Sequence, residues 1–314
     1  MRIGVDLMGS DSSPQTLYQG ILEAINQLPE DVSLLVFSTQ NFQPTHSRIA
    51  FHIISEVISM EDDPLSSIRL KKDSSLVVGL RFLKEKKLDG FVSAGNTGAL
   101  VALCSLTLPL FSGIERPALL ALLPTKKEPF ALVDVGGTHT VKSKNLVQYA
   151  IMGAAFQRCL NGIEKPVVGL LNIGAESKKG TPEVREAYPL LQQLGANPDS
   201  KIIFAGNIEG RAVFEGNIDV LVTDGFTGNV MLKTSEGVSD LIFDYLDDHT
   251  EHPQLADLRR HFSYEEHPGA IVCGIDALVM KCHGAASSQA MMRSILATSI
   301  LIETRFLTKI QQEL

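Results

Sequence analysis

The sequence predicts an α/β protein with a mainly parallel sheet that helices cover on both faces. Apolar strand-like runs alternate with helical runs along most of the 314 residues, which is the order typical of such sheets. Hydrophobic residues make up 44% of the chain, enough to bury a large core. Polar, glycine-rich loops follow several strands, and ligands in this fold class bind beyond the carboxyl ends of the strands. We therefore expect one α/β domain over residues 1–314, with a ligand site along one edge of its sheet.

The first half of the chain predicts strands and helices in turn. Arg2–Asp6 is a short apolar strand, and Pro14 opens a helix in the first-turn position that proline favours. Residues 40–60 predict a short helix followed by a strand over Ile49–Ile54. The other expected strands are Val32–Ser38, Gly90–Ser93, Ala118–Leu123 and Phe130–Val133, and the other helices begin at Pro64, Ser74 and Thr97.

The second half is organised around residues 218–237. A buried strand over Val220–Thr223 leads into a tight loop and then into a long helix that we expect to reach His249. Val272 and Leu278–Lys281 predict edge strands, and Ser287–Leu307 predicts one C-terminal helix. The remaining expected elements are helices over Asn145–Leu160 and from Pro182 to Gly195, and strands over Val167–Leu171 and Lys201–Ala205.

Composition and charge exclude several classes of protein. The net charge of -8 and the lack of a basic run argue against a general nucleic-acid binder. The chain opens on a strand rather than a signal peptide, and its four widely spaced cysteines indicate reduced thiols of a cytosolic protein. The apolar run Gly98–Ile114 is interrupted by polar residues and is shorter than the ~20 residues of a membrane-spanning helix, so we expect a buried helix there.

Polar loops that follow apolar strands are the main functional signal. None matches the glycine-rich motifs of nucleoside triphosphatases or dinucleotide-binding folds, and the chain lacks the G-x-S-x-G elbow of serine hydrolases. Because the loops are expected to meet at one edge of the sheet, together they predict a ligand site. They span Leu7–Asp11, Ala94–Gly98, Asp134–Thr140, Asn172–Gly180, Gly206–Arg211 and Asp224–Asn229.

The loop Asp224–Asn229 suits an anion such as phosphate. It ends at a helix start, where unpaired backbone N–H groups and a partial positive charge favour negative ligands. Gly225 and Gly228 would let the backbone approach such a ligand closely, and Lys233 lies one helical turn further on. An ordinary strand-to-helix turn with a surface lysine is the alternative.

Other charged residues in these regions admit two interpretations each. Lys179, in a glycine loop, is either an anion-binding group or a solvated lysine. Asp6, Asp11 and Asp224 suit metal binding, yet such residues more often cap and hold loops. His283, in K-C-H-G-A-A, is a general acid, a hydrogen-bond donor to an oxyanion or a structural histidine. His139, in D-V-G-G-T-H, likewise has a functional and a structural interpretation.

Several of these motifs occur together in one known family. The order D-L-M-G-S-D, S-A-G-N-T-G-A, D-V-G-G, L-L-N-I-G with E-S-K-K-G, N-I-E-G-R and T-D-G-F-T-G-N-V resembles the phosphate acyltransferases of bacterial phospholipid synthesis, over Met1 to about Gly284. The resemblance implies a three-layer α/β/α catalytic domain akin to phosphotransacetylases and isocitrate-dehydrogenase-like enzymes. It also implies a homodimer that converts acyl carrier protein thioesters and phosphate into acyl phosphate, with no cofactor or metal.

The chain departs from the family pattern at a few places. Ser10 and Ser12 stand where the family has glycine and histidine, and Thr138 with His139 replaces an asparagine motif. The polar segment Leu246–Pro268 is shorter and more acidic than the apolar, basic insertion of relatives. We therefore expect a cytoplasmic protein that associates loosely, if at all, with the inner face of the membrane.

The chemistry of this reaction suggests roles for the candidate residues. Lys179, Asn229, His283 and Asn96 are the expected catalytic residues, with His283 a proton donor to the leaving thiolate. Expected partners are acyl carrier protein, phosphate, a second copy of the chain and a glycerol-3-phosphate acyltransferase that receives the product. The alternatives are a phosphotransacetylase that acts on acyl-CoA and a non-enzymatic lipid-sensing or scaffold protein. The expected phosphate- and substrate-binding residues are Asp6, Gly9, Asp11, Gly95, Thr97, Asn172, Glu176, Asp224, Gly225, Thr227, Gly228 and Lys233.

Overall fold

The computed structural model describes residues 1–138, 140–249 and 269–314, with the backbone alone at 247–249. His139 and most of the segment Leu246–Pro268, on which the membrane prediction rests, therefore lie outside the described residues. The chain divides into two compact units. Unit 1 consists of residues 1–111 and 265–307, and unit 2 consists of residues 112–264 and 308–314.

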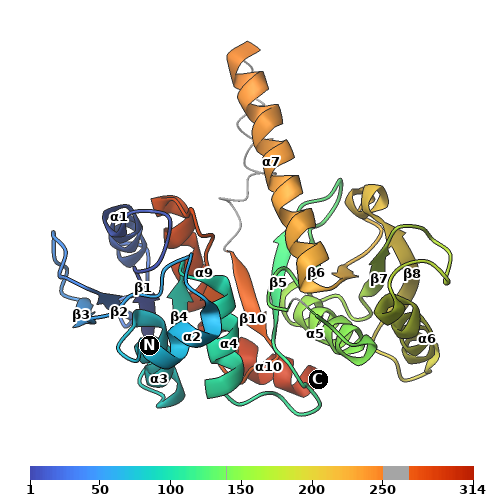
Figure 1. The fold of residues 1–314 in the computed structure, drawn as a ribbon, viewed down its shortest axis with the longest axis horizontal. Coiled ribbons are helices and arrows are strands. Elements are labelled where there is room, and N and C mark those ends of the chain that lie inside the picture. The colour runs from blue at the N-terminus through green and yellow to red at the C-terminus, as the bar shows by residue number, and fades with distance from the viewer. Residues whose placement is uncertain (139, 250–268) are drawn as a thin grey trace. The chain divides into compact units, whose positions relative to one another are not determined.

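Unit 1 is built on a largely parallel sheet. Its strands follow the order β3-β2-β1-β4-β11-β10, and β10 against β11 is the antiparallel pair. Helices α1 and α9 lie on one side of these strands and α2, α3 and α4 on the other (Figure 1). The strands are β1 (Arg2–Asp6), β2 (Ser33–Ser38), β3 (Ile49–Ile53), β4 (Gly90–Ser93), β10 (Ala270–Cys273) and β11 (Val279–Lys281), and the helices are α1 (Pro14–Ile25), α2 (Pro64–Leu70), α3 (Ser75–Lys84), α4 (Thr97–Thr107) and α9 (Ser288–Glu303).

Unit 2 repeats this plan. Its strand order is β5-β6-β9-β7-β8, parallel except for β5 against β6, and α5 and α6 pack on its strands. The strands are β5 (Ala118–Leu123), β6 (Phe130–Val133), β7 (Val167–Asn172), β8 (Ile203–Glu209) and β9 (Val220–Val222), and the helices are α5 (Ser143–Asn161), α6 (Pro182–Ala196), the short 3₁₀ helix η1 (Gly210–Glu215) and α7 (Gly225–His249); α10 (Phe306–Glu313) ends the chain.

Local sequence accounts for most helix starts. Pro14, Pro64 and Pro182 each occupy the first turn of a helix, where the missing N–H costs nothing. The side chains of Ser13, Asp63 and Thr181 accept hydrogen bonds from the backbone N–H groups of the first turn. The prediction of a mainly parallel α/β fold is confirmed.

Several predicted elements are wrong in detail. β11 is no edge strand, because it lies between β4 and β10 in unit 1. The expected loop Gly206–Arg211 begins inside β8, since Gly206 adopts φ +86° at a bulge and the strand continues to Glu209. Residues 40–48 form no helix, and Tyr18 holds this segment through a hydrogen bond to the Pro44 carbonyl. The C-terminal helix is broken at Arg305, which has φ 54°. Among the described residues, no helix is long and apolar enough to cross a membrane.

Candidate functional site

A row of buried polar side chains crosses the carboxyl ends of three neighbouring strands in unit 1. Asp6 ends β1, Ser93 ends β4 and Lys281 ends β11, and the strand register pairs Asp6 with Ser93 and Ser93 with Lys281. Their exposed fractions are 0%, 0% and 6%. The Ser93 hydroxyl donates to a carboxylate oxygen of Asp6 at 2.8 Å, and the Met8 N–H donates to the other at 2.8 Å. Both oxygens of Asp6 therefore bind groups of the protein itself.

Burial shifts the pKa of the carboxyl group in this row. The loss of solvent raises the pKa of Asp6 from 3.8 to about 6, and the hydrogen bonds from Met8, Ser75 and Ser93 with the charge of Lys281 oppose that rise. The Lys281 ammonium donates to the carbonyl oxygens of Ala94, at 3.4 Å, and Cys282.

The loop after β1 packs on two other loops of unit 1. Gly9 has φ +70°, and a β-carbon there would lie 2.0 Å from the Ile58 carbonyl oxygen, so only glycine fits. The Asp11 N–H donates to the Gly284 carbonyl oxygen at 3.0 Å, and the Ser10 hydroxyl donates to the same oxygen at 2.7 Å. Ser10, a departure from the family pattern, therefore ties the first loop to the loop that carries His283.

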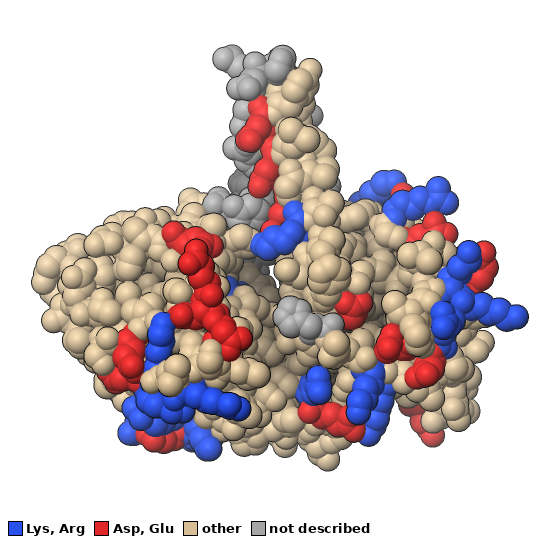
Figure 2. Space-filling view, in the orientation of Figure 1, with Lys and Arg blue, Asp and Glu red and all other residues tan. Residues whose placement is uncertain are grey.

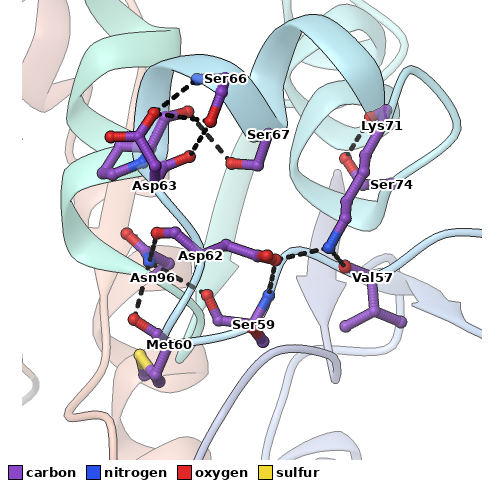
Figure 3. Close-up of polar contacts among 11 residues, drawn as sticks. Val57, Ser59, Met60, Asp62, Asp63, Ser66, Ser67, Lys71, Ser74 and Asn96 are labelled. Carbon is purple, nitrogen blue, oxygen red and sulfur yellow. Dashed lines mark hydrogen bonds and ion pairs between the residues drawn. The ribbon is translucent and has the colours of Figure 1, made fainter.

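Asn96 holds the segment before α2 in place (Figure 3). Its side-chain amide donates to the carbonyl oxygens of Ser59 and Met60, at 3.0 and 3.2 Å. Its side-chain oxygen accepts from the Ala99 N–H at 3.0 Å and caps α4, in which Thr97 is the first residue. The catalytic assignment of Asn96 stays a prediction, and these contacts give its side chain a holding role in the structure.

His283 is half-buried beside this cluster. Its Nδ1 accepts a hydrogen bond from the Ala285 N–H at 3.2 Å, so the proton of the neutral ring resides on Nε2. Neutral imidazole in this tautomer can donate to a developing negative charge.

Asp134 organises the corresponding edge of unit 2. One of its carboxylate oxygens accepts from the N–H groups of Leu119 and Gly137, at 2.9 and 2.8 Å, and the other accepts from the Thr138 hydroxyl at 2.7 Å. Burial raises the pKa of Asp134. Thr138, another departure from the family pattern, thus links Asp134 to α5, because its hydroxyl also lies 3.2 Å from the Tyr149 hydroxyl.

The first turn of α7 lies directly on this loop. Asp224 accepts from the Thr227 N–H and hydroxyl, at 2.9 and 2.7 Å, as a helix cap does. Gly225 and Gly228 approach the protein backbone: β-carbons there would lie 2.2 Å from the Thr138 carbonyl oxygen and 1.9 Å from that of Asp134. α7 begins at Gly225, so the expected loop Asp224–Asn229 is mostly helix. Asn229 is exposed next to Gly136.

The loop after β7 carries the predicted anion-binding lysine. The Asn172 side chain bonds both ends of this loop, because it accepts from the Ile173 N–H at 2.8 Å and donates to the Lys179 carbonyl oxygen at 3.0 Å. The Lys179 side chain is exposed and, with Glu176, lies beside Gly174.

Asn207 of β8 is hydrogen-bonded to the same loop. It donates to the Glu176 carbonyl oxygen at 2.9 Å. Its own side-chain oxygen is the buried side-chain atom without a hydrogen-bond partner in the described part of the chain.

The structure thus gathers the predicted residues into two groups. Asp6, Gly9, Asp11, Gly95, Asn96, Thr97 and His283 lie together at one edge of unit 1, and Asn172, Glu176, Lys179, Asp224, Gly225, Thr227, Gly228 and Asn229 lie in loops or a first turn that follow β7 and β9 in unit 2. Lys233 is further along α7, exposed and paired with Glu236 at 2.8 Å. The sequence placed Asp134 and Asn207 in loops of the expected site without giving either residue a role. It missed Lys281, for which the signal was a lysine that ends an otherwise apolar strand.

The fold defines the class of protein. A solved branched-chain phosphotransacylase from Enterococcus faecalis V583 matches with a TM-score of 0.63 at 14% identity, covering 96% of this chain and 99% of that one. The chain has the three-layer α/β/α fold of the phosphotransacetylases.

Sequence relatives narrow the class to one family. A family described as fatty acid synthesis protein matches residues 1–309. The phosphate acyltransferase of Chlamydia pneumoniae is 38% identical over 328 residues, covering 100% of this chain and 99% of the relative. That of Acetivibrio thermocellus is 38% identical over 332 residues, covering 100% and 96%. The chain belongs to this family, and the resemblance seen in the sequence is confirmed.

Proposed function

We propose that the chain moves a fatty acyl group from the thioester of acyl carrier protein to inorganic phosphate. Family membership supplies the coarser statement: the chain is a phosphate acyltransferase whose product enters phospholipid synthesis. The observation that carries the proposal is the full-length match to phosphate acyltransferases at 38% identity. We further propose that residues 1–314 work as a single catalytic domain without metal or cofactor.

In this proposal, the polar loops of unit 2 bind phosphate. Lys179 supplies a positive charge on an exposed loop whose two ends Asn172 fixes. The first turn of α7 adds backbone N–H groups and the positive end of a helix dipole. Asn229 is exposed on that turn and can donate to a phosphate oxygen.

The reaction needs an acceptor anion, a polarised carbonyl and a proton for sulfur. A phosphate oxygen attacks the thioester carbon, the C–S bond breaks, and the proton of hydrogen phosphate ends on the released thiol. In our proposal, His283 donates a hydrogen bond from Nε2 to the departing sulfur, which stabilises the developing thiolate until it takes up that proton. Phosphate at neutral pH is already an anion, so no separate base is required.

One assay tests the proposed activity. Acyl carrier protein loaded with a fatty acyl group is incubated with the protein, with and without phosphate, and released thiol is measured. We expect release that depends on phosphate. A faster reaction with acyl-CoA would indicate the phosphotransacetylase alternative, and no release from either donor would indicate a lipid-sensing or scaffold protein.

We also propose that the chain acts as a homodimer. Exposed apolar side chains recur on α7 at mostly three- and four-residue spacings, the pattern of one helix face. Figure 2 shows the described part of α7 as largely uncharged, with acidic side chains along one edge. The exposed residues are Phe226, Val230, Val238, Leu241, Ile242 and Tyr245. Light scattering should give twice the mass of the 34.1 kDa chain, and Leu241→Lys should reduce it to that of the monomer.

The chemistry of the proposed product favours its direct handover to the next enzyme. An acyl phosphate is a reactive mixed anhydride with a long apolar tail, so we propose direct transfer to a glycerol-3-phosphate acyltransferase. We propose a cytoplasmic protein that meets the inner face of the membrane loosely, in keeping with its net charge of -8. Tight sedimentation with anionic vesicles at physiological salt would contradict this.

A further inference from the structure

Lys281 occupies a position where packing alone would favour an apolar residue. Val279 and Met280, its neighbours on β11, are completely buried, and Lys281 itself is 6% exposed. Burying an ammonium group is costly unless it is paired and hydrogen-bonded. Replacing a buried ion pair by apolar residues is often neutral or stabilising. A lysine at this place therefore calls for a role beyond stability.

The contacts of Lys281 lead to two proposed catalytic residues. Its ammonium group donates to the carbonyl oxygen of Ala94, which stands two residues before Asn96. It also donates to the carbonyl oxygen of Cys282, the residue directly before His283. One side chain thus bonds the backbone of both loops, at the ends of β4 and β11.

Asp6 is the acidic residue in the row of Asp6, Ser93 and Lys281, and its charge is opposite to that of Lys281. Through Ser93 its carboxylate reaches the first of these loops, because the Ser93 hydroxyl donates to Asp6 and accepts from the Gly95 N–H at 3.0 Å. Four groups lower the pKa of Asp6: the Met8 N–H, the hydroxyls of Ser75 on α3 and Ser93 on β4, and the ammonium of Lys281 on β11. Of these four groups, only the Lys281 ammonium carries a charge.

We propose that Lys281, with Asp6 as its counter-charge, is a positioning residue that fixes the loops of Asn96 and His283 in the geometry that the acyl transfer needs. The inference rests on the proposed function, since it concerns residues placed in that reaction. Lys281 is too deeply buried to touch phosphate, so it should affect the chemical step rather than phosphate binding.

Lys281→Met tests this with a side chain of similar length and no charge. We expect kcat for phosphate-dependent thiol release to fall about 10- to 100-fold, the range for a lost charged hydrogen bond, while KM for phosphate stays nearly constant. The matched control is Lys84→Met, an exposed lysine of α3 in the same unit, which should keep the wild-type kcat.

The pH profile separates positioning from plain structural support. Removing the Lys281 charge removes a factor that lowers the pKa of Asp6. The acid limb of kcat should therefore move to higher pH in Lys281→Met and stay in place in Lys84→Met. An unchanged kcat and an unmoved acid limb in a folded Lys281→Met would overturn the proposal.

Two further measurements cover the remaining outcomes. If Lys281→Met does not fold, the double variant Asp6→Asn/Lys281→Met removes both buried charges, and it should fold yet show the same loss in kcat. Hydrogen exchange needs no activity: exchange in residues 94–97 and 283–286 should accelerate in either variant and not in Lys84→Met. If the wild-type protein releases no thiol, the proposed function fails, and the exchange result still decides whether Lys281 fixes these loops.

Discussion

Gly228 of α7 packs directly against the backbone of Asp134. A β-carbon at residue 228 would lie 1.9 Å from the Asp134 carbonyl oxygen, far inside any real contact distance. Asp134 in turn holds its own loop through Leu119, Gly137 and Thr138. The helix start and this loop therefore form one packed piece, and the glycine of T-D-G-F-T-G-N-V is required by the protein itself before any ligand is considered.

We predict that Gly228→Ala destabilises the protein by about 1–3 kcal/mol, the cost of overpacking a tight contact, and lowers activity by shifting the first turn of α7. Gly237→Ala is the matched control, because it lies in the same helix with nothing within 4 Å of an added β-carbon. That variant should gain about 0.5–1 kcal/mol from better helix propensity. Urea unfolding measures both values, and a Gly228→Ala protein as stable as the control would refute the packing argument.

Asp6 should make stability depend on pH. Its folded pKa of about 6 exceeds its ordinary value of 3.8, so between these values the folded state holds a proton that the unfolded state has lost. The stability contributed by Asp6 is then present at low pH and falls as pH rises towards 6. We predict that wild type loses about 2 kcal/mol more than Asp6→Asn between pH about 4.5 and about 7. Parallel stability curves for the two proteins in urea titrations would exclude this burial effect.

Lys179 is expected to bind phosphate. We predict that Lys179→Ala raises KM for phosphate about 10- to 100-fold, the loss expected for a charged hydrogen bond, and leaves the fold intact because the side chain is exposed. Lys178→Ala, also an exposed residue of this loop, is the control. Steady-state rates against phosphate concentration distinguish them, and equal KM values for both variants and wild type would remove Lys179 from the site.

Local signals in the sequence predicted the helix starts and most of the polar loops, because proline, capping residues and apolar runs act over a few residues. The partners of these loops depend on contacts between distant segments. No local pattern shows that Asp134 bonds Leu119, or that Lys281 reaches Ala94. The sequence likewise gave no sign of the helix break at Arg305. This residue adopts φ 54°, and it is neither the glycine nor the asparagine that usually marks such a turn.

The cysteines bear on whether an acyl group is ever attached to the enzyme. A covalent route needs a thiolate or another activated nucleophile with a base beside it. Burial raises the pKa of Cys104, of Cys159 and of Cys282, which keeps these thiols protonated and unreactive. Cys282 follows directly on β11 and is 1% exposed, with its thiol bonded to Ser294 on α9. His283 is its neighbour in sequence, yet its Nδ1 is occupied by the Ala285 N–H.

Direct attack by phosphate is therefore our last prediction. Incubation with acyl carrier protein that bears a labelled acyl group, without phosphate, should leave no label on the denatured protein, because phosphate is the acceptor and no side chain replaces it. Cys282→Ser should keep most of the wild-type kcat, since the thiol at this position is buried and protonated. Stoichiometric labelling of the wild-type protein would rule out the direct route, and its loss in Cys282→Ser would identify that sulfur as the nucleophile.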